Sequence, residues 1–343
     1  MSDIVKPLIQ KIVTNTSYSE DEMKAAFGAI MSGDVSPALI SAFLISLKMR
    51  GETPSDITAG AATLREMADK ITAPEGAIDI VGTGGDGIGT YNISTATAFV
   101  VAGCGVTVAK HGNRAVSSKS GAADVLTALG VNLDAPFEIL EEALAKAGVC
   151  FLMAPRHHSA MRHVGPIRAE LGTRTIFNLL GPLSNPALVS RIMVGVYDKQ
   201  WCRPFAEALH ALGTSDAWVV HGGDGLDEVT TTTATHVAAL KDGVITEFEI
   251  APGDYGMETA SLDDLKGGTG EENAAALRAL LNNDATASKA YRDIVLMNAA
   301  AALVGTNHAD DFDSALASAT ASLNNGSALK ALDSLVAITN KAK

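Results

Sequence analysis

Short apolar runs alternate with stretches of helical spacing from residue 78 to residue 220. The runs lie at 78–81, 106–109, 149–153, 192–196 and 217–220 and consist mostly of Val, Ile and other apolar residues. Strands buried on both faces have this composition, whereas strands with one wet face alternate. The pattern predicts an α/β fold with a mainly parallel central sheet. Two further runs at 237–240 and 244–250, joined by Lys241-Asp242-Gly243, predict one antiparallel hairpin.

Residues 1–73 show helical spacing only and predict a small N-terminal helical domain. Ile4, Leu8 and Ile12 share one helical face, and Ser19 with Glu22 has the spacing of a capping box. The linker is expected at 74–76. We expect a larger α/β domain at 74–164 and 191–343, and we expect part of the segment 165–190, which holds three prolines, to belong to the helical domain.

The chain carries 26 Lys and Arg residues against 39 Asp and Glu residues, a formal net charge of -13. Such an acidic chain is not expected to bind nucleic acid or an anionic membrane broadly, so an anionic ligand requires a local basic site. Cys104, Cys150 and Cys202 are too far apart for a CxxC metal site and odd in number for a disulfide framework. With no targeting or membrane segment visible, we expect a cytoplasmic protein.

A glycine-rich segment follows the first expected strand and precedes a helix. Residues 82–90 read GTGGDGIGT, with five glycines in eight residues. Glycines let backbone N–H groups approach an anion closely, and a helix N-terminus adds partial positive charge, so the segment predicts a phosphate-binding loop. It also satisfies GxGxxG, but the acidic residue that a dinucleotide site needs is missing, because no acid lies between Asp86 and Asp124. A tight strand-to-helix turn is the structural alternative.

A second polar segment, KHGNRAVSSKSG at 110–121, follows the next expected strand. It contains Lys110, Arg114 and Lys119 and no carboxylate. In parallel sheets ligands bind beyond the carboxyl ends of the strands, so we expect the two loops to face one cavity. The composition suits an anion of the size of a diphosphate, and a solvated basic loop is the alternative.

Two further groups of residues carry possible chemistry. His157, His158 and His163 lie in a segment without nearby acids, so packing or hydrogen bonding is favoured over a metal site. One of the arginines at 156, 162 and 168 is expected to bind a substrate carboxylate. Asp227 and Glu228 follow the expected strand at 217–220 and form a possible Mg²⁺ site beside the phosphate loops, since Mg²⁺ borrows phosphate oxygens.

These motifs together resemble those of the anthranilate phosphoribosyltransferases, which act second in tryptophan biosynthesis. The resemblance rests on GTGGD at 82–86, NIST at 92–95, KHGNR at 110–114, GPIR at 165–168, NLLGPL at 178–183 and the acids at 227–228, all in order along the chain. It implies a glycosyltransferase that moves the phosphoribosyl group of phosphoribosyl pyrophosphate to the amine of anthranilate and releases pyrophosphate. It also implies a homodimer formed through the helical part.

The resemblance also implies roles for individual residues. Ser94, Asp227 and Glu228 are expected to bind Mg²⁺, with two ions per subunit. Gly82, Asn113 and Arg168 are expected to lie around anthranilate, and His111, Asn113 and Arg168 are the expected catalytic residues. The donor is expected to be surrounded by Gly82, Gly85, Asp86, Thr90, Asn92, Ser94, Thr95, Lys110, Asn113, Ser118 and Ala122. The other residues expected to bind a substrate are Ile93, His111, Gly112, Arg114, Ala115, Val116, Ser117 and Arg168.

The chemistry follows from displacement at the anomeric carbon, which develops negative charge on the leaving pyrophosphate. Mg²⁺, Lys110 and loop amides would stabilise that charge. The aromatic amine is already neutral at pH 7, so His111 is either a proton acceptor or a structural residue. Two rivals stay open here: a pyrimidine nucleoside phosphorylase of the same superfamily, and a nucleic-acid-binding relative, which the acidic charge disfavours.

Overall fold

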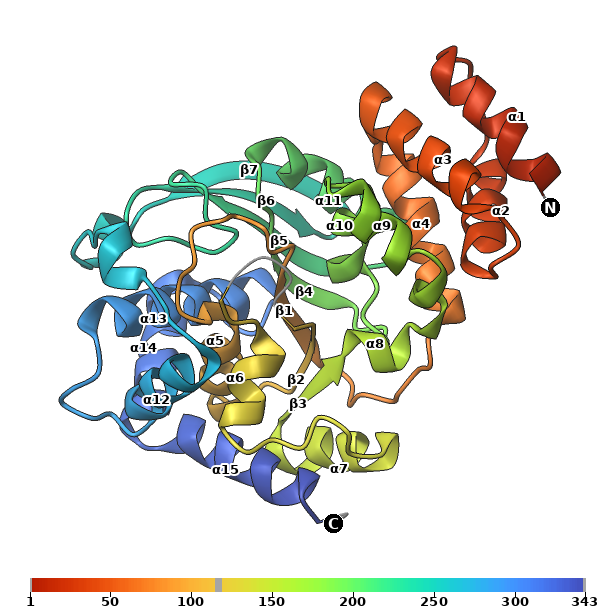
Figure 1. Ribbon diagram of the computed structural model, residues 1–343. Helices are drawn as coiled ribbons and strands as arrows, with labels where there is room; N and C mark the ends of the chain where they lie inside the picture. The colour runs from red at the N-terminus through yellow and green to blue at the C-terminus, as the bar shows by residue number, and fades with distance from the viewer. Residues whose placement is uncertain (1, 115–118, 342–343) are drawn as a thin grey trace.

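The computed structural model describes residues 2–114 and 119–341. The first four helices are α1 (Ser2–Val13), α2 (Glu20–Met31), α3 (Pro37–Arg50) and α4 (Pro54–Met67), and they form the bundle at the upper right of Figure 1. Two of them begin with proline, whose missing N–H costs nothing at a first helical position. The predicted capping box of Ser19 and Glu22 is confirmed at the start of α2.

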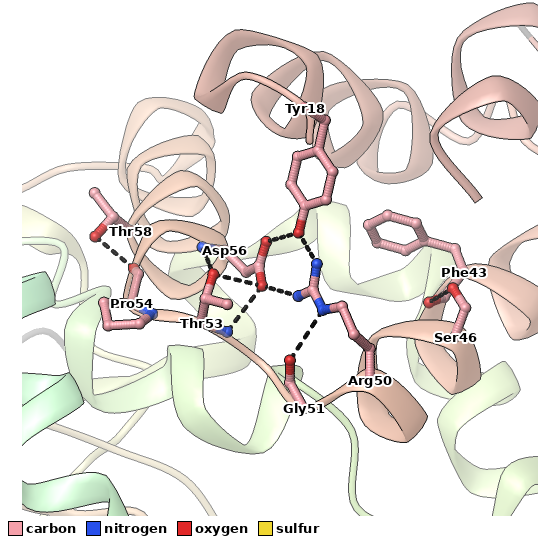
Figure 2. A network of polar contacts seen from close by, with 9 residues as sticks. All are labelled: Tyr18, Phe43, Ser46, Arg50, Gly51, Thr53, Pro54, Asp56 and Thr58. Atoms are coloured by element: carbon pink, nitrogen blue, oxygen red, sulfur yellow. Dashed lines mark hydrogen bonds and ion pairs between the residues drawn. The ribbon is translucent and has the colours of Figure 1, made fainter. Parts of the chain in front are cut away.

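A buried ion pair ties the bundle together (Figure 2). The carboxylate of Asp56 is fully buried and accepts hydrogen bonds from the Tyr18 hydroxyl at 2.6 Å and from the Thr53 N–H at 2.8 Å, and it pairs with the Arg50 guanidinium. These groups come from the entry to α2, the end of α3 and the start of α4. Removing one partner would leave a buried charge uncompensated, so the network stabilises this arrangement of three helices.

The larger part of the chain is built on one seven-stranded sheet. Its strands are β1 (Ile78–Gly82), β2 (Val108–Gly112), β3 (Val149–Met153), β4 (Arg191–Gly195), β5 (Asp216–Gly222), β6 (Thr235–Lys241) and β7 (Val244–Ile250), in the order β3-β2-β1-β4-β5-β6-β7. The first five are parallel, and β6 and β7 form the predicted antiparallel hairpin. The predicted fold class is confirmed.

Helices cover both faces of the sheet (Figure 1). The chain forms α5 (Ile93–Gly103), α6 (Ala122–Ala128), α7 (Phe137–Ala147), α8 (Ala154–His157), α9 (Gly165–Leu171), α10 (Phe177–Leu180), α11 (Cys202–Ala211), α12 (Gly270–Leu281), α13 (Lys289–Gly305), α14 (Phe312–Asn324) and α15 (Ser327–Thr339). In β4, Met193 packs into the core beneath α5 and α13, whereas Ile192 and Val194 pack into the core shared with α11 and the bundle. Both faces are therefore apolar, as the continuous strand pattern predicts.

The strand order reverses between β1 and β4. The connection after β1 leads through α5 to β2 on one side, and the connection after β4 leads through α11 to β5 on the other. Loops that diverge in this way leave a crevice beyond the carboxyl ends of the strands, where α/β proteins bind ligands. Within the described ranges, no helix is both long and apolar enough to cross a membrane.

Candidate active site

Two glycines, Gly82 and Gly195, lie at the base of the crevice between β1 and β4, and Asp227 lies over them. Gly82 and Gly195 are in register at the ends of these strands, and the loop after β5 lays Asp227 directly over them. A Cβ on Gly82 would reach the Asp227 carboxylate, and a Cβ on Gly195 would overlap the Asp227 carbonyl. The absence of both side chains therefore sets how deeply Asp227 enters the crevice.

The glycine-rich loop has backbone conformations that require glycine. Gly84, Gly85 and Gly87 have φ angles of 67, 80 and 77°, in the left-handed region where other side chains are strained. The Gly84 N–H donates to the Asp227 carboxylate at 2.6 Å, and the Ile88 N–H donates to the Asp86 carboxylate at 3.2 Å. The loop thus turns back over the crevice and carries Asp86 to the side of Asp227.

Ser94 connects the second acid to the buried lysine. The Ser94 N–H, in the first turn of α5, donates to the Glu228 carboxylate at 3.1 Å, and its hydroxyl accepts a hydrogen bond from the Lys110 ammonium at 3.1 Å. Lys110 also donates to the carbonyl of Ile80 at 2.5 Å and is only 4% exposed. The predicted metal ligands Ser94, Asp227 and Glu228 therefore lie together, next to Lys110.

Burial and mutual repulsion raise the pKa of both Asp227 and Glu228 above the usual carboxyl range. For Asp227 the repelling charge is Asp86, and for Glu228 it is Asp227. Such a cluster favours a bound cation, because a cation relieves both penalties. Within the described residues, no group of three or more His, Cys, Asp or Glu side chains is arranged to hold a metal ion by itself. This donor set fits Mg²⁺, which keeps waters and takes further oxygens from a phosphate ligand.

His111 is held between the sheet and the bundle side of the crevice. Its N–H donates to Asp79 at 3.1 Å, and its Nδ1 lies 3.2 Å from the carbonyl of Gly181. Burial lowers the pKa of His111 to about 3, with the neighbouring histidines adding to the shift. The imidazole is therefore neutral at pH 7. The Gly181 contact is satisfied by an Nδ1–H donor, which leaves Nε2 unprotonated; this atom is buried and has no hydrogen-bond partner among the described residues.

Lys110 and His111 lie inside β2, which begins two residues and ends three residues later than the expected strand at 106–109. The register with β3 explains the shift. Val108 pairs with Val149, the first residue of β3 after the left-handed Gly148, so pairing begins only there. Both side chains are consequently fixed by a strand backbone and not by a loop.

Arg168 lies on α9, which begins with Gly165 and Pro166 and ends at Leu171, with Gly172 as its C-cap. Its guanidinium carbon lies 5.8 Å from the centroid of the Phe177 ring, and burial lowers the pKa of the guanidinium. The other two arginines of the segment are placed differently. Arg156 donates to the carbonyls of Leu133 and Ala135 at 2.8 and 2.7 Å, which ties it to the backbone, whereas Arg162 is exposed.

The remaining donor-loop residues occupy several environments. Asn92 precedes α5, and its side-chain oxygen accepts from Asn273 at 2.8 Å and from the Ser120 hydroxyl at 3.3 Å. Asn113 is exposed, and Arg114 pairs with Asp124 at the edge of an open cavity of about 660 Å³ between α6 and α12. Thr90 forms an isolated bridge with Lys266, Gly112 is the last residue of β2, and Ala122 is the first residue of α6. The side chains of Ile93 and Thr95 are buried in the core. Ala115, Val116, Ser117 and Ser118 lie outside the described residues.

His157 packs as the sequence predicts. It stacks on Phe137 with ring centroids 4.6 Å apart, and its Nδ1 lies 2.6 Å from the carbonyl of Asp69. His158 lies beside His111, with centroids 5.2 Å apart. These contacts make both rings part of the packing around the crevice.

Sequence reasoning missed three residues that support this site. Gly195 gives no local signal, because a glycine in a strand has many uses. Arg174 donates to the carbonyl of Gly85 and lies over the Tyr197 ring, 4.0 Å from its centroid. Asp79 does give a signal, since it is an acid inside a buried apolar run, and it is fully buried in β1.

Comparisons with known proteins agree with this geometry. The helical bundle domain of a glycosyl transferase family matches residues 6–68, and the a/b domain of a glycosyl transferase family matches residues 74–329. Anthranilate phosphoribosyltransferase from Rhizobium meliloti (strain 1021) is 55% identical over 342 residues, which covers 100% of each chain.

Two solved structures from Saccharomyces cerevisiae share the fold. Anthranilate phosphoribosyltransferase in complex with PRPP and Mg is 27% identical, with a TM-score of 0.90 and coverage of 99% of this chain and 98% of that chain. The enzyme in complex with 4-fluoroanthranilate is 26% identical, with a TM-score of 0.88 and the same coverage. Because the identity to a named relative extends over its full length, this chain belongs to the anthranilate phosphoribosyltransferase family.

Proposed function

We propose that this protein transfers the phosphoribosyl group of phosphoribosyl pyrophosphate to the amine of anthranilate and releases pyrophosphate, in tryptophan biosynthesis. The observation that carries this function is the placement of Asp227, Glu228 and Lys110 together at the β1–β4 crevice, beneath the glycine-rich loop. A yeast relative binds PRPP and Mg, and another structure of it binds 4-fluoroanthranilate. Both ligands carry anionic groups, for which Lys110 and Arg168 are the candidate cations.

The donor is held by the two loops at the carboxyl ends of β1 and β2. The loop glycines present backbone N–H groups, and the N-terminus of α5 adds partial positive charge for the phosphates. Ser94, Asp227 and Glu228 hold Mg²⁺, with two ions per subunit, and when bound these ions neutralise the charge that develops on pyrophosphate. The donor residues predicted above, including those at 115–118, complete this assignment.

Lys110 supplies a fixed positive charge at the leaving group. Burial lowers the pKa of its ammonium, and the carboxylates of Asp79, Glu228 and Asp227 oppose that shift. The ammonium is already oriented by Ile80 and Ser94, so little reorganisation is needed when charge develops on pyrophosphate. This preorganised electrostatic effect lowers the barrier to departure.

The acceptor is oriented by Arg168, Asn113 and Gly82. The guanidinium of Arg168 forms a planar fork that matches a carboxylate, and no ion pair occupies it among the described residues. The anthranilate amine is neutral at pH 7 and attacks the anomeric carbon directly, so positioning provides much of the effect. The neutral His111 then offers Nε2 as an acceptor for the proton that the amine loses.

We further propose a division of labour between two domains. Residues 1–73 with part of 165–190 form the small helical domain, and residues 74–164 and 191–343 form the larger one. In support, α9 contacts α3 and α10 contacts α4, so the segment that carries Arg168 packs on the bundle. The acceptor arginine would then belong to one domain and the donor loops to the other.

The assembly and compartment are also proposals. A homodimer formed through the helical domain is supported by the exposed apolar side chains Ile4 and Val13 on α1 and Met49 on α3, which are 41%, 66% and 84% exposed. A cytoplasmic location is supported by three unpaired cysteines, which suit a reducing compartment. Light scattering of the purified protein tests the dimer.

The experiment that tests the function follows the fluorescence of anthranilate. The purified protein is mixed with anthranilate and phosphoribosyl pyrophosphate, with and without Mg²⁺. We expect the fluorescence to disappear only when donor and Mg²⁺ are both present, with pyrophosphate released in equal amount. No loss of anthranilate in the complete mixture, together with phosphate-dependent cleavage of thymidine or uridine, would instead identify a nucleoside phosphorylase.

A further inference from the structure

A buried carboxylate and a buried amide lie beside β2, the strand that carries Lys110. Asp79, the second residue of β1, is fully buried, and Asn185, in the connection before β4, is 3% exposed. The Asn185 side-chain amide donates to the Asp79 carboxylate at 2.8 Å. The two residues are 106 positions apart in the chain. Burying a carboxylate costs free energy unless its oxygens accept hydrogen bonds. The apolar side chains around Asp79 supply no such donors, so Asp79 depends on Asn185 and on backbone N–H groups.

The pair contacts the backbone of β2 on both sides of Lys110. The second carboxylate oxygen of Asp79 accepts from the His111 N–H at 3.1 Å, and the Asn185 amide donates to the Ala109 carbonyl at 2.8 Å. The position of the strand is therefore set immediately before and immediately after Lys110. Asn185 is itself oriented, because its side-chain oxygen accepts from the Ala187 N–H at 2.8 Å.

The same pair joins the donor side of the crevice to the segment that carries the acceptor arginine. Asn185 follows α10 and the 3-10 turn Gly181–Leu183, whose Gly181 carbonyl lies 3.2 Å from Nδ1 of His111. His111 is thus held at its backbone by Asp79 and at its ring by Gly181. The Asp79 carboxylate also supplies negative charge close to the buried Lys110 ammonium. One buried contact therefore influences the position of both Lys110 and His111.

We propose that Asp79 and Asn185 are a pair of positioning residues for the transfer reaction, which fix β2 so that Lys110 faces the leaving pyrophosphate and His111 faces the amine. This role rests on the proposed function. Neither residue touches substrate. They act through the backbone of β2 and through the charge of Asp79. The pairing requires that residue 79 accepts a hydrogen bond and that residue 185 donates it.

That dependence permits a reciprocal test with Asp79→Asn, Asn185→Asp and the double exchange. In Asp79→Asn, two amide groups face each other and one N–H group loses its acceptor; in Asn185→Asp, two carboxyl groups face each other. In the double exchange, residue 79 again accepts from the His111 N–H and again pairs with residue 185. Two differences remain: the negative charge now lies on residue 185, and the Ala109 carbonyl faces a carboxylate oxygen where it had accepted a hydrogen bond from the Asn185 amide.

The variants are compared by kcat and by the KM for each substrate in the anthranilate fluorescence assay, below the melting temperature of each protein. We expect each single exchange to lower kcat by about 10- to 100-fold, the scale of a misplacement of about 1 Å. The KM for anthranilate should change much less than kcat, because the charge on pyrophosphate develops only in the transition state. The double exchange should recover part of the lost kcat, because it restores the hydrogen bond to the His111 N–H but neither the charge at residue 79 nor the contact to the Ala109 carbonyl.

Asp56→Asn is the matched control, since Asp56 is an equally buried carboxylate in a polar network outside the crevice. It should lower the melting temperature and leave kcat unchanged. If Asp79→Asn does not fold, Asn185→Ser, which keeps the Asp79 charge, is tested in its place and should also lower kcat. Unchanged kcat in a folded single variant, or a double exchange no better than the worse single one, overturns the pair. An unaltered protein that consumes no anthranilate refutes the proposed function instead.

Discussion

Gly195→Ala is predicted to displace the acid pair of the crevice. A Cβ built on Gly195 lies 1.7 Å from the carbonyl oxygen and 2.3 Å from the carbonyl carbon of Asp227. Nonbonded atoms separate to about 3.5 Å, so the backbone at Asp227 must move by on the order of 1–2 Å. Gly195 has no positive φ angle, so the backbone of β4 itself accepts alanine. The whole effect therefore falls on the loop that carries Asp227 and Glu228.

The size of the effect follows from this displacement. Inserting one methyl group into a packed region costs about 1–3 kcal/mol of stability, which the surrounding core of a chain this size tolerates. A shift of about 1 Å at a positioning group costs about 100-fold in rate. We therefore expect a folded protein with kcat/KM reduced by about 100-fold and a raised Mg²⁺ requirement, because the acids no longer meet the Ser94 and Gly84 N–H groups.

The assay is a titration of Mg²⁺ at saturating phosphoribosyl pyrophosphate, followed by the loss of anthranilate fluorescence. A thermal melt of each protein verifies folding. The control is Gly28→Ala in α2, where a Cβ would meet nothing within 4 Å. That variant should keep its Mg²⁺ dependence and gain about 1 kcal/mol of helix stability. A folded Gly195→Ala protein with the Mg²⁺ dependence of the unaltered chain would refute the argument that the missing side chain sets the depth of Asp227.

Three other predictions concern the predicted site residues. The double variant Asp227→Asn/Glu228→Gln keeps shape but removes charge, so activity should fall steeply and need more Mg²⁺; unaltered Mg²⁺ dependence would contradict the metal assignment. Arg168→Ala should raise the KM for anthranilate by about 10- to 150-fold, the equivalent of about 1.5–3 kcal/mol, and Lys at this position should rescue part of the loss; an effect on the donor alone would show that Arg168 binds phosphate. Burial lowers the pKa of His111 from 6.5 to about 3, so between these values the unfolded chain binds a proton that the folded chain does not, and the free energy of unfolding falls as the pH falls. Between pH 7 and pH 5, the free energy of unfolding of the His111→Gln variant should therefore fall by about 2 kcal/mol less than that of the unaltered protein, as measured by urea titrations. Equal decreases in the two proteins would contradict the buried neutral imidazole.

Local pattern determined much of the fold. The alternation of continuous apolar runs with helical spacing predicted the parallel sheet, and Ser19 with Glu22 predicted the start of α2, because periodicity and capping are properties of neighbouring residues. The glycine-rich loop was also readable, since several left-handed residues in succession demand glycine. The boundaries of β2 were not readable, because they depend on where β3 begins.

The tertiary structure alone decided which distant residues meet at the crevice. Gly195 and Asp227 give no sign in the sequence that one must lack a side chain to admit the other. Asp79 is visible as an acid in an apolar run, yet its partner Asn185 lies 106 residues away. Such contacts depend on the order of the strands and on the reversal between β1 and β4. Sequence periodicity records which face of an element is buried, but it carries no information on which element lies against that face.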